Sequence, residues 1–223
     1  MDERRLDAAL RRLPRGHLPH HVQALRKRHW LAGFAAVAVI LTTTVAAPAA
    51  DIEAGRRKAQ PCAACHGPDG NATLPGTPSL AGQPAWFTHW TLFKYRDGRR
   101  KDPVMSPFAA SLSDADMADL SAYYAAQTPR PRAQRVDPAK AAEGRTLANG
   151  YLCTSCHKPD LTGQNQVPRL AGQDLEYLLK MLRAYKAQTA GDLEGLMTQA
   201  AQPLSDADIE RLVHFMAGLG AAQ

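Results

Sequence analysis

The first fifty residues contain an apolar stretch unlike anything later in the chain. Residues 30–47 carry no charged side chain, whereas residues 1–29 hold eight Lys or Arg and three acidic residues. A basic segment, an uncharged run and then the small residues Ala47-Pro48-Ala49 are typical of an export leader, cleaved near Ala50. The run of 18 residues is also just long enough for an uncleaved membrane anchor. In either case the basic residues 26–28 predict that the remaining chain lies on the far side of the membrane.

Two later segments combine a helix-start signal with apolar residues at helical spacing. Ser205 and Asp208 resemble a capping box, in which the serine oxygen accepts a hydrogen bond from a free amide at the helix start. The apolar residues that follow at i, i+3, i+4 and i+7 are Ile209, Leu212, Val213 and Met216. Ser113 and Asp116 precede a similar set, Met117, Leu120 and Tyr124. Each of these segments therefore predicts an amphipathic helix.

Helices are the only regular structure that the pattern predicts after residue 50. Residues 84–95 and 174–186 also show helical spacing, and no segment alternates apolar and polar residues as a half-buried strand does. We therefore expect an all-α fold, preceded by the N-terminal hydrophobic export or anchor helix.

The same landmarks occur twice, in the same order and about ninety residues apart. They are the Cys-x-x-Cys-His strings at 62–66 and 153–157, the Leu-Ala-Gly-Gln strings at 80–83 and 170–173, and Met105 and Met197, each seven residues before Leu-Ser-Asp-Ala-Asp. This order indicates a duplicated domain, and the Pro- and Arg-rich segment between the copies predicts a linker. The expected organisation is an export leader (1–50), a first domain (51–128), a linker (129–138) and a second domain (139–223).

Each Cys-x-x-Cys-His string has the spacing of a c-type haem attachment site. Two cysteines three residues apart lie on one side of a helical turn, so their sulfurs can form thioethers to the two vinyl groups of one haem. The histidine that follows can then bind the iron from the same face of the porphyrin. We predict two covalently attached haem c groups, held by Cys62, Cys65, Cys153 and Cys156, with His66 and His157 as axial ligands of the iron.

Three other uses of paired cysteines fit the sequence less well. A four-cysteine zinc site would require the two pairs to converge across the repeat and would leave the histidines without a role. A redox-active Cys-x-x-Cys normally follows a strand, and none is predicted. A disulfide between cysteines three residues apart closes almost no loop and adds little stability.

Met105 and Met197 are the candidates for the second axial ligand of each iron. They stand at equivalent positions of the repeat, 39 residues after His66 and 40 after His157. An isolated methionine is more often a core residue, but the matched placement favours ligation. The unpaired Met117, Met181 and Met216 are expected to be packing residues, as are His89 and His214. With both axial positions filled, no site remains open for oxygen or a substrate, so we expect an electron carrier rather than an enzyme.

The charge distribution argues against nucleic acid as a partner. The formal net charge of +6 consists of +5 before residue 51 and only +1 after it. The basic run of Arg96, Arg99, Arg100 and Lys101 is expected to be a solvated loop, with partner orientation or pairing with haem propionates as the alternative.

These motifs resemble those of class I cytochromes c, and in particular the dihaem cytochrome c4 type of bacterial periplasms. The resemblance covers nearly everything after residue 50. It implies that the carbonyls of Pro78 and Pro168, each two residues before the Leu-Ala-Gly-Gln string, hold the axial histidine rings. It also implies that the first and last helices of each domain cross where a glycine meets an aromatic ring: Gly55 with Tyr123 or Tyr124, and Gly144 with Phe215. The long leader, and Lys158 in the place of Gly67, depart from the family pattern.

The function that this resemblance implies is electron transfer in a respiratory chain, outside the cytoplasm. The expected partners are redox proteins, such as a quinol-oxidising complex as donor and a terminal oxidase as acceptor. The protein is expected in the periplasm, either free after leader cleavage or attached to the inner membrane through residues 30–47. Two alternatives remain: a cytochrome subunit of a larger dehydrogenase, and a dihaem oxidoreductase or peroxidase.

Overall fold

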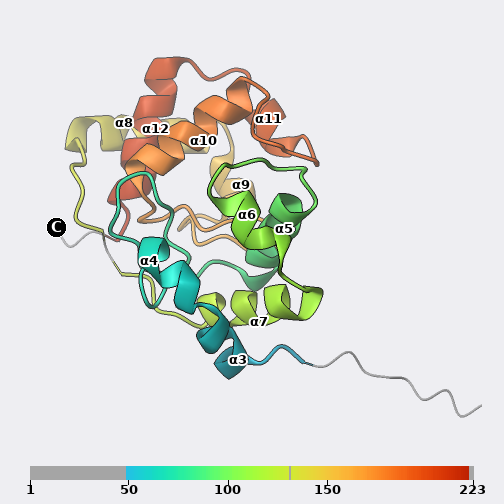
Figure 1. Ribbon diagram of the computed structural model, residues 1–223. Helices are drawn as coiled ribbons and strands as arrows, with labels where there is room; N and C mark the ends of the chain where they lie inside the picture. The colour runs from blue at the N-terminus through green and yellow to red at the C-terminus, as the bar shows by residue number, and fades with distance from the viewer. Residues whose placement is uncertain (1–48, 131, 221–223) are drawn as a thin grey trace, which may run out of the picture. The chain divides into compact units, whose positions relative to one another are not determined.

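The computed structural model describes residues 49–130 and 132–220. The predicted export or anchor helix therefore lies outside the described residues. Within those ranges, no helix has the length and apolar character needed to cross a membrane. The described chain is built from helices and loops, and its β structure is limited to one isolated bridge between Gln164 and Val167 (Figure 1). The all-α prediction is confirmed for this part of the chain.

The two halves repeat the same order of helices. The first half forms α3 (Ile52–Lys58), the 3₁₀ turn η1 (Gln60–Cys62), α4 (Ala63–His66), α5 (Ala85–Arg96), α6 (Met105–Ala110) and α7 (Asp114–Ala125). The second half forms α8 (Pro138–Gly150), α9 (Cys153–His157), α10 (Leu175–Lys186), α11 (Leu196–Ala201) and α12 (Asp206–Gly218). The four segments that the sequence predicts as helical correspond to α5, α7, α10 and α12.

Both predicted capping boxes are present. The Ser113 side chain accepts a hydrogen bond from the Asp116 amide, and the Asp116 carboxylate accepts one from the Ser113 amide. Ser205 and Asp208 make the same pair of bonds at the start of α12. Each box satisfies free amides at a helix start and places a negative charge at the positive end of the helix dipole. The boxes thereby set the starting points of α7 and α12.

The first and last helices of each half pack at a glycine, as the family resemblance implied. In α3, a Cβ on Gly55 would lie 2.1 Å from the Asp119 carbonyl oxygen of α7 and 2.8 Å from the Tyr123 Cβ. In α8, a Cβ on Gly144 would lie 2.1 Å from the Arg211 carbonyl oxygen of α12, next to Phe215. Only glycine allows the backbones to approach this closely. Figure 1 shows α3 beside α7 and α8 beside α12.

The protein core of each half is small, and the first is the smaller. In the first half, one cluster of buried apolar residues consists of Ala59, Leu120, Tyr123 and Tyr124. The cluster of the second half is larger and is centred on α12, with Ile209, Leu212 and Val213 nearly inaccessible to solvent. Domains of this size bury little surface by themselves and gain stability from an internal prosthetic group.

The segment between the halves is held by a buried cation. The Arg132 guanidinium forms a 3.1 Å ion pair with Asp174, and both side chains are less than a tenth exposed. The same guanidinium donates hydrogen bonds to the carbonyl oxygens of Ala72 and Leu74 in the first half. Arg132 therefore connects a loop of the first half to the start of α10 in the second.

Candidate haem sites

His66 is the last residue of α4, and its ring is oriented by a carbonyl group. The Nδ1 atom lies 2.8 Å from the Pro78 carbonyl oxygen, and the residue is only 5% exposed. Burial lowers the pKa of the imidazole, while the carbonyl contact opposes this shift. A neutral ring that donates its Nδ1 hydrogen keeps its Nε2 lone pair free to bind a metal.

His157 repeats this arrangement at the end of α9. Its Nδ1 atom lies 2.8 Å from the Pro168 carbonyl oxygen, and burial lowers the pKa of its imidazole as well. The two histidine–proline contacts that the family resemblance implied are therefore both present. Each contact fixes the ring orientation and supports the basicity of the ring as a ligand.

The four cysteines lie in two separate pairs, and no disulfide bond joins any of them. In each pair the first cysteine, Cys62 or Cys153, is half-buried, and burial raises the pKa of its thiol. The second, Cys65 or Cys156, is exposed. Among the described residues, no three His, Cys, Asp or Glu side chains gather as they would around a structural zinc ion.

Met105 and Met197 occupy equivalent short helices. Met105 is the first residue of α6, which packs against α5. Met197 is the second residue of α11, which packs against α10, and its side chain contacts the core of the second half. Both methionines are half-buried. By contrast, Met117 and Met216 are fully buried on α7 and α12, in agreement with the packing role predicted for them.

The solvated-loop prediction is wrong for two residues of the basic run: Arg96 is the last residue of α5, and Arg100 is buried. Arg100 is 8% exposed, and its guanidinium donates to the Tyr177 hydroxyl (3.2 Å) and the Met181 sulfur (3.1 Å). It also lies over the Tyr95 ring, 4.8 Å from the centroid. All of these partners are neutral, and a buried cation is costly without a nearby anion. This burial could not be predicted from the sequence, because it arises where α10 of the other half packs over the loop.

The donor groups of each half fit haem c. Each half offers two thiols for the vinyl groups, a neutral imidazole held by a carbonyl, and a thioether at an equivalent position. The described partners of the buried Arg100 guanidinium carry no charge, so a haem propionate would supply the negative charge that this cation lacks. Two helical halves with this set of groups define a dihaem c-type cytochrome.

Comparisons with known proteins agree with this class. The family profile described as "Cytochrome c" matches the chain twice, over residues 52–126 and 141–220. A curated cytochrome c4 of Pseudomonas aeruginosa is 35% identical over 198 residues, which cover 82% of this chain and 97% of that protein. A protein of Stutzerimonas stutzeri named "Thiosulfate dehydrogenase electron acceptor" is 33% identical, with coverages of 88% and 97%.

A solved structure supports the same assignment. The crystal structure of reduced recombinant cytochrome c4 from Pseudomonas stutzeri superposes with a TM-score of 0.72 at 34% identity, over 77% of this chain and all of that one. The chain therefore belongs to the cytochrome c family, as a tandem two-domain protein of the cytochrome c4 type. It carries two covalently attached haem c groups, and it is an electron-transfer protein.

Proposed function

We propose that this protein carries electrons between larger redox complexes in the periplasm, from a quinol-oxidising complex to a terminal oxidase, and catalyses no reaction of its own. The observation that carries the proposal is the matched pair of ligand groups in the two halves. Each half supplies a carbonyl-held histidine and an equivalently placed methionine. Together these would fill both axial positions of a haem iron and leave none for oxygen, peroxide or a substrate.

The roles of the residues follow from their chemistry. Four thiols form the thioether links: Cys62 and Cys65 in the first half, Cys153 and Cys156 in the second. His66 and His157 would bind iron through Nε2, and the carbonyls of Pro78 and Pro168 hold the two rings. Met105 and Met197 supply soft, neutral sulfur ligands, which favour ferrous iron and raise the reduction potential. When bound, each haem supplies a one-electron Fe(III)/Fe(II) couple.

The position of the protein in the cell rests on its N-terminal segment. Haem c attached to a chain with a basic segment and an apolar run points to a site outside the cytoplasm. Residues 30–47 would either be removed with the leader or keep the protein at the inner membrane. Fractionation followed by N-terminal sequencing of the haem-stained protein distinguishes a cleaved leader from an anchor.

The methionine ligands can be tested by substitution. In Met105→His and Met197→His we expect each variant to lose about half of the Met-to-iron charge-transfer absorption, because one of the two haems changes its ligand. The potential of that haem should fall, since imidazole stabilises ferric iron relative to a thioether. Met117→Leu, at a fully buried methionine, is the matched control and should keep the whole band. Retention of the full band in either His variant would refute the assignment.

One relative favours a second candidate role. The Stutzerimonas protein is named as an electron acceptor of thiosulfate dehydrogenase, and it matches this chain over nearly its whole length. In that role the protein would work as the cytochrome partner of a dehydrogenase rather than as a respiratory shuttle. Stopped-flow reduction of the purified protein by a quinol-oxidising complex and by a thiosulfate dehydrogenase compares the two donors directly. Faster reduction by the dehydrogenase, or stable copurification with it, would favour this alternative.

A peroxidase or other dihaem oxidoreductase remains as the enzymatic alternative. Such an enzyme needs an iron with a displaceable ligand, whereas each half here offers two ligands. Adding peroxide to the reduced protein tests this point. A high-spin haem, or rapid turnover of peroxide, would contradict the carrier proposal.

A further inference from the structure

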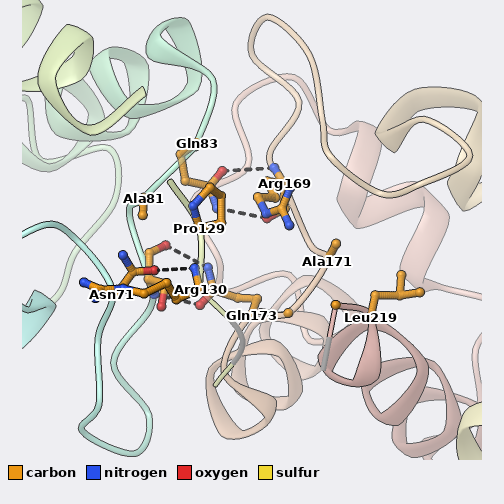
Figure 2. Close-up of a pocket in the computed structure, with 12 residues that line it drawn as sticks. Asn71, Ala81, Gln83, Pro129, Arg130, Arg169, Ala171, Gln173 and Leu219 are labelled. Atoms are coloured by element: carbon orange, nitrogen blue, oxygen red, sulfur yellow. Dashed lines mark hydrogen bonds between the residues drawn. The ribbon is translucent and has the colours of Figure 1, made fainter. Parts of the chain in front are cut away.

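The loops that hold the two axial histidines are bound to each other across the halves. Gln83, at the end of the first Leu-Ala-Gly-Gln string, donates from Nε2 to the Arg169 carbonyl (2.9 Å) and accepts at Oε1 from the Arg169 amide (2.9 Å). Figure 2 shows this side chain reaching across to Arg169. The side chain is buried, with only 4% of Gln83 exposed.

Gln173 makes the reciprocal pair of bonds. It accepts at Oε1 from the Ser79 amide (2.7 Å) and donates from Nε2 to the Ser79 carbonyl (2.9 Å), and it is 5% exposed. Ser79 and Arg169 stand at equivalent positions of the repeat, as do Gln83 and Gln173. The bonds across the halves are therefore symmetric, since each half inserts its glutamine into the loop of the other. Gln173 Oε1 in addition accepts from the Asp174 amide of its own half (2.9 Å).

The amides bound by the glutamines belong to the same peptide groups that hold the histidines. The Pro78 carbonyl, which contacts His66, is joined in one peptide to the Ser79 amide, which donates to Gln173. The Pro168 carbonyl, which contacts His157, is joined likewise to the Arg169 amide, which donates to Gln83. A continuous chain of hydrogen bonds thus runs from each histidine, through one peptide group, to a glutamine of the opposite half.

Such a chain affects the iron ligand through polarisation. A peptide whose N–H donates a hydrogen bond has a more negative carbonyl oxygen, because hydrogen bonds in series strengthen one another. A more negative oxygen draws more strongly on the histidine Nδ1 hydrogen and makes the ring a stronger electron donor. Stronger donation favours ferric iron and lowers the reduction potential.

We propose that Gln83 and Gln173 are crossed positioning residues: Gln173 lowers the potential of the first-half haem through His66, and Gln83 lowers that of the second-half haem through His157. The proposal rests on the axial roles assigned to these histidines above. It makes the potential of each haem dependent on contact with the other half, so that separation of the halves would raise both potentials.

The test measures the potentials of the two haems in the full-length holoprotein. Gln173→Leu should raise the potential of the haem bound by His66 and leave the other unchanged, and Gln83→Leu should do the reverse. The haems are assigned by repeating each titration in the Met105→His background, where the first-half haem is identified by its lowered potential. Gln202→Leu is the control, because its amide bonds only to Lys186 and Thr198 of its own half.

Two further measurements distinguish an effect of the glutamines on the haem reduction potentials from a purely structural role at the contact between the halves. Gln173→Glu keeps an oxygen that accepts from the Ser79 amide, so the potential of the His66 haem must not rise as it does in the Leu variant. In proton spectra of the reduced protein, the Nδ1 hydrogen of His66 should shift in Gln173→Leu and stay in place in Gln83→Leu.

Three outcomes would overturn the inference: potentials that do not move, potentials that move equally at both haems, and a shift at the haem of the substituted half. The wild-type spectrum keeps this result distinct from failure of the proposed function. If both wild-type haems are low-spin with methionine ligation and the crossed shifts are absent, only the tuning role is lost. If the wild-type haems lack methionine ligation, it is the proposed electron-carrier function that is refuted, whatever the glutamine variants show.

Discussion

The residue after each axial histidine adopts nearly the same backbone conformation in the two halves. Gly67 has φ 80° and ψ 157°, and Lys158 has φ 69° and ψ 161°. Glycine tolerates this region, whereas a residue with a Cβ is strained there. The substitution noted in the sequence as a departure from the family pattern therefore places a strained residue beside the second haem ligand.

Relief of this strain is measurable. Lys158→Gly should raise the free energy of unfolding by about 1 kcal/mol, because the left-handed strain exceeds the entropy cost of an added glycine. Denaturant unfolding of the holoprotein provides the measurement. The reverse change, Gly67→Lys, should destabilise the protein, since a Cβ there would lie 2.4 Å from the Asn71 carbonyl oxygen. An unchanged or lower stability of Lys158→Gly would show that the lysine is not strained.

Arg100 provides a second prediction at the scale of one residue. Its buried positive charge disfavours ferric haem, so Arg100→Gln should lower the potential of at least one haem. Arg99→Gln is the matched control: Arg99 is exposed, bonds to Asp97, and should leave the potentials nearly unchanged. A spectroelectrochemical titration compares the variants with the wild type. Equal potentials for Arg100→Gln and the wild type would rule out a propionate role.

Among the elements, the two halves secure the same helix pair with different charges. Between α3 and α7, Lys58 lies 2.7 Å from Asp116 and 2.6 Å from Asp119. Between α8 and α12, the ion pairs are Lys140 with Glu210 and Arg211 with Glu143. The glycine crossing is thus common to both halves, while the polar contacts around it have diverged.

The Lys58 pairs predict a pH-dependent stability. The Lys58 ammonium lowers the pKa of Asp116 and of Asp119, so the folded state favours their charged forms. Their contribution is complete above the ordinary aspartate pKa of about 4 and is lost as the pH falls through the lower folded values. Lys58→Met should therefore have a lower free energy of unfolding than the wild type at pH 7. The difference in free energy between the two proteins should decrease as the pH falls.

Denaturant unfolding at pH 7 and in mildly acidic to acidic buffers measures that gap. Arg56→Met serves as control, because Arg56 pairs only with Glu53 of its own helix. If the difference in free energy of unfolding between Lys58→Met and the wild type stayed constant through the acid range, the Lys58 ion pairs would not be the source of the stability.

The elements also show what a single sequence can and cannot predict. The long helices α10 and α12 follow from periodicity, and α7 from its capping box. The six-residue helices α6 and α11 are too short to show a period, although they carry the two candidate methionine ligands. Those methionines were found only because the repeat places them at matching positions.

In the molecule as a whole, duplication of landmarks was enough to predict two cytochrome domains and two haems. The histidine–proline contacts followed from the family resemblance. The glutamines of the Leu-Ala-Gly-Gln strings were recognised as repeated residues. The contacts of their side chains were not predicted, because these contacts depend on how one half packs against the other. The burial of Arg100 and Arg132 escaped prediction for the same reason: a surface in one half becomes interior only when the second half covers it.

Each half is expected to bind one haem c covalently and to fill both axial positions of its iron. Two measurements on the full chain, produced with haem-attachment machinery, check this together: a redox titration followed by absorption, and a haem count after extraction in acidified solvent. We expect two haems per chain that resist extraction, both low-spin, with a Met-to-iron charge-transfer band in the oxidised protein. Haem that is released by the solvent would rule out covalent attachment, and a high-spin signal from either site would rule out two protein ligands on that iron.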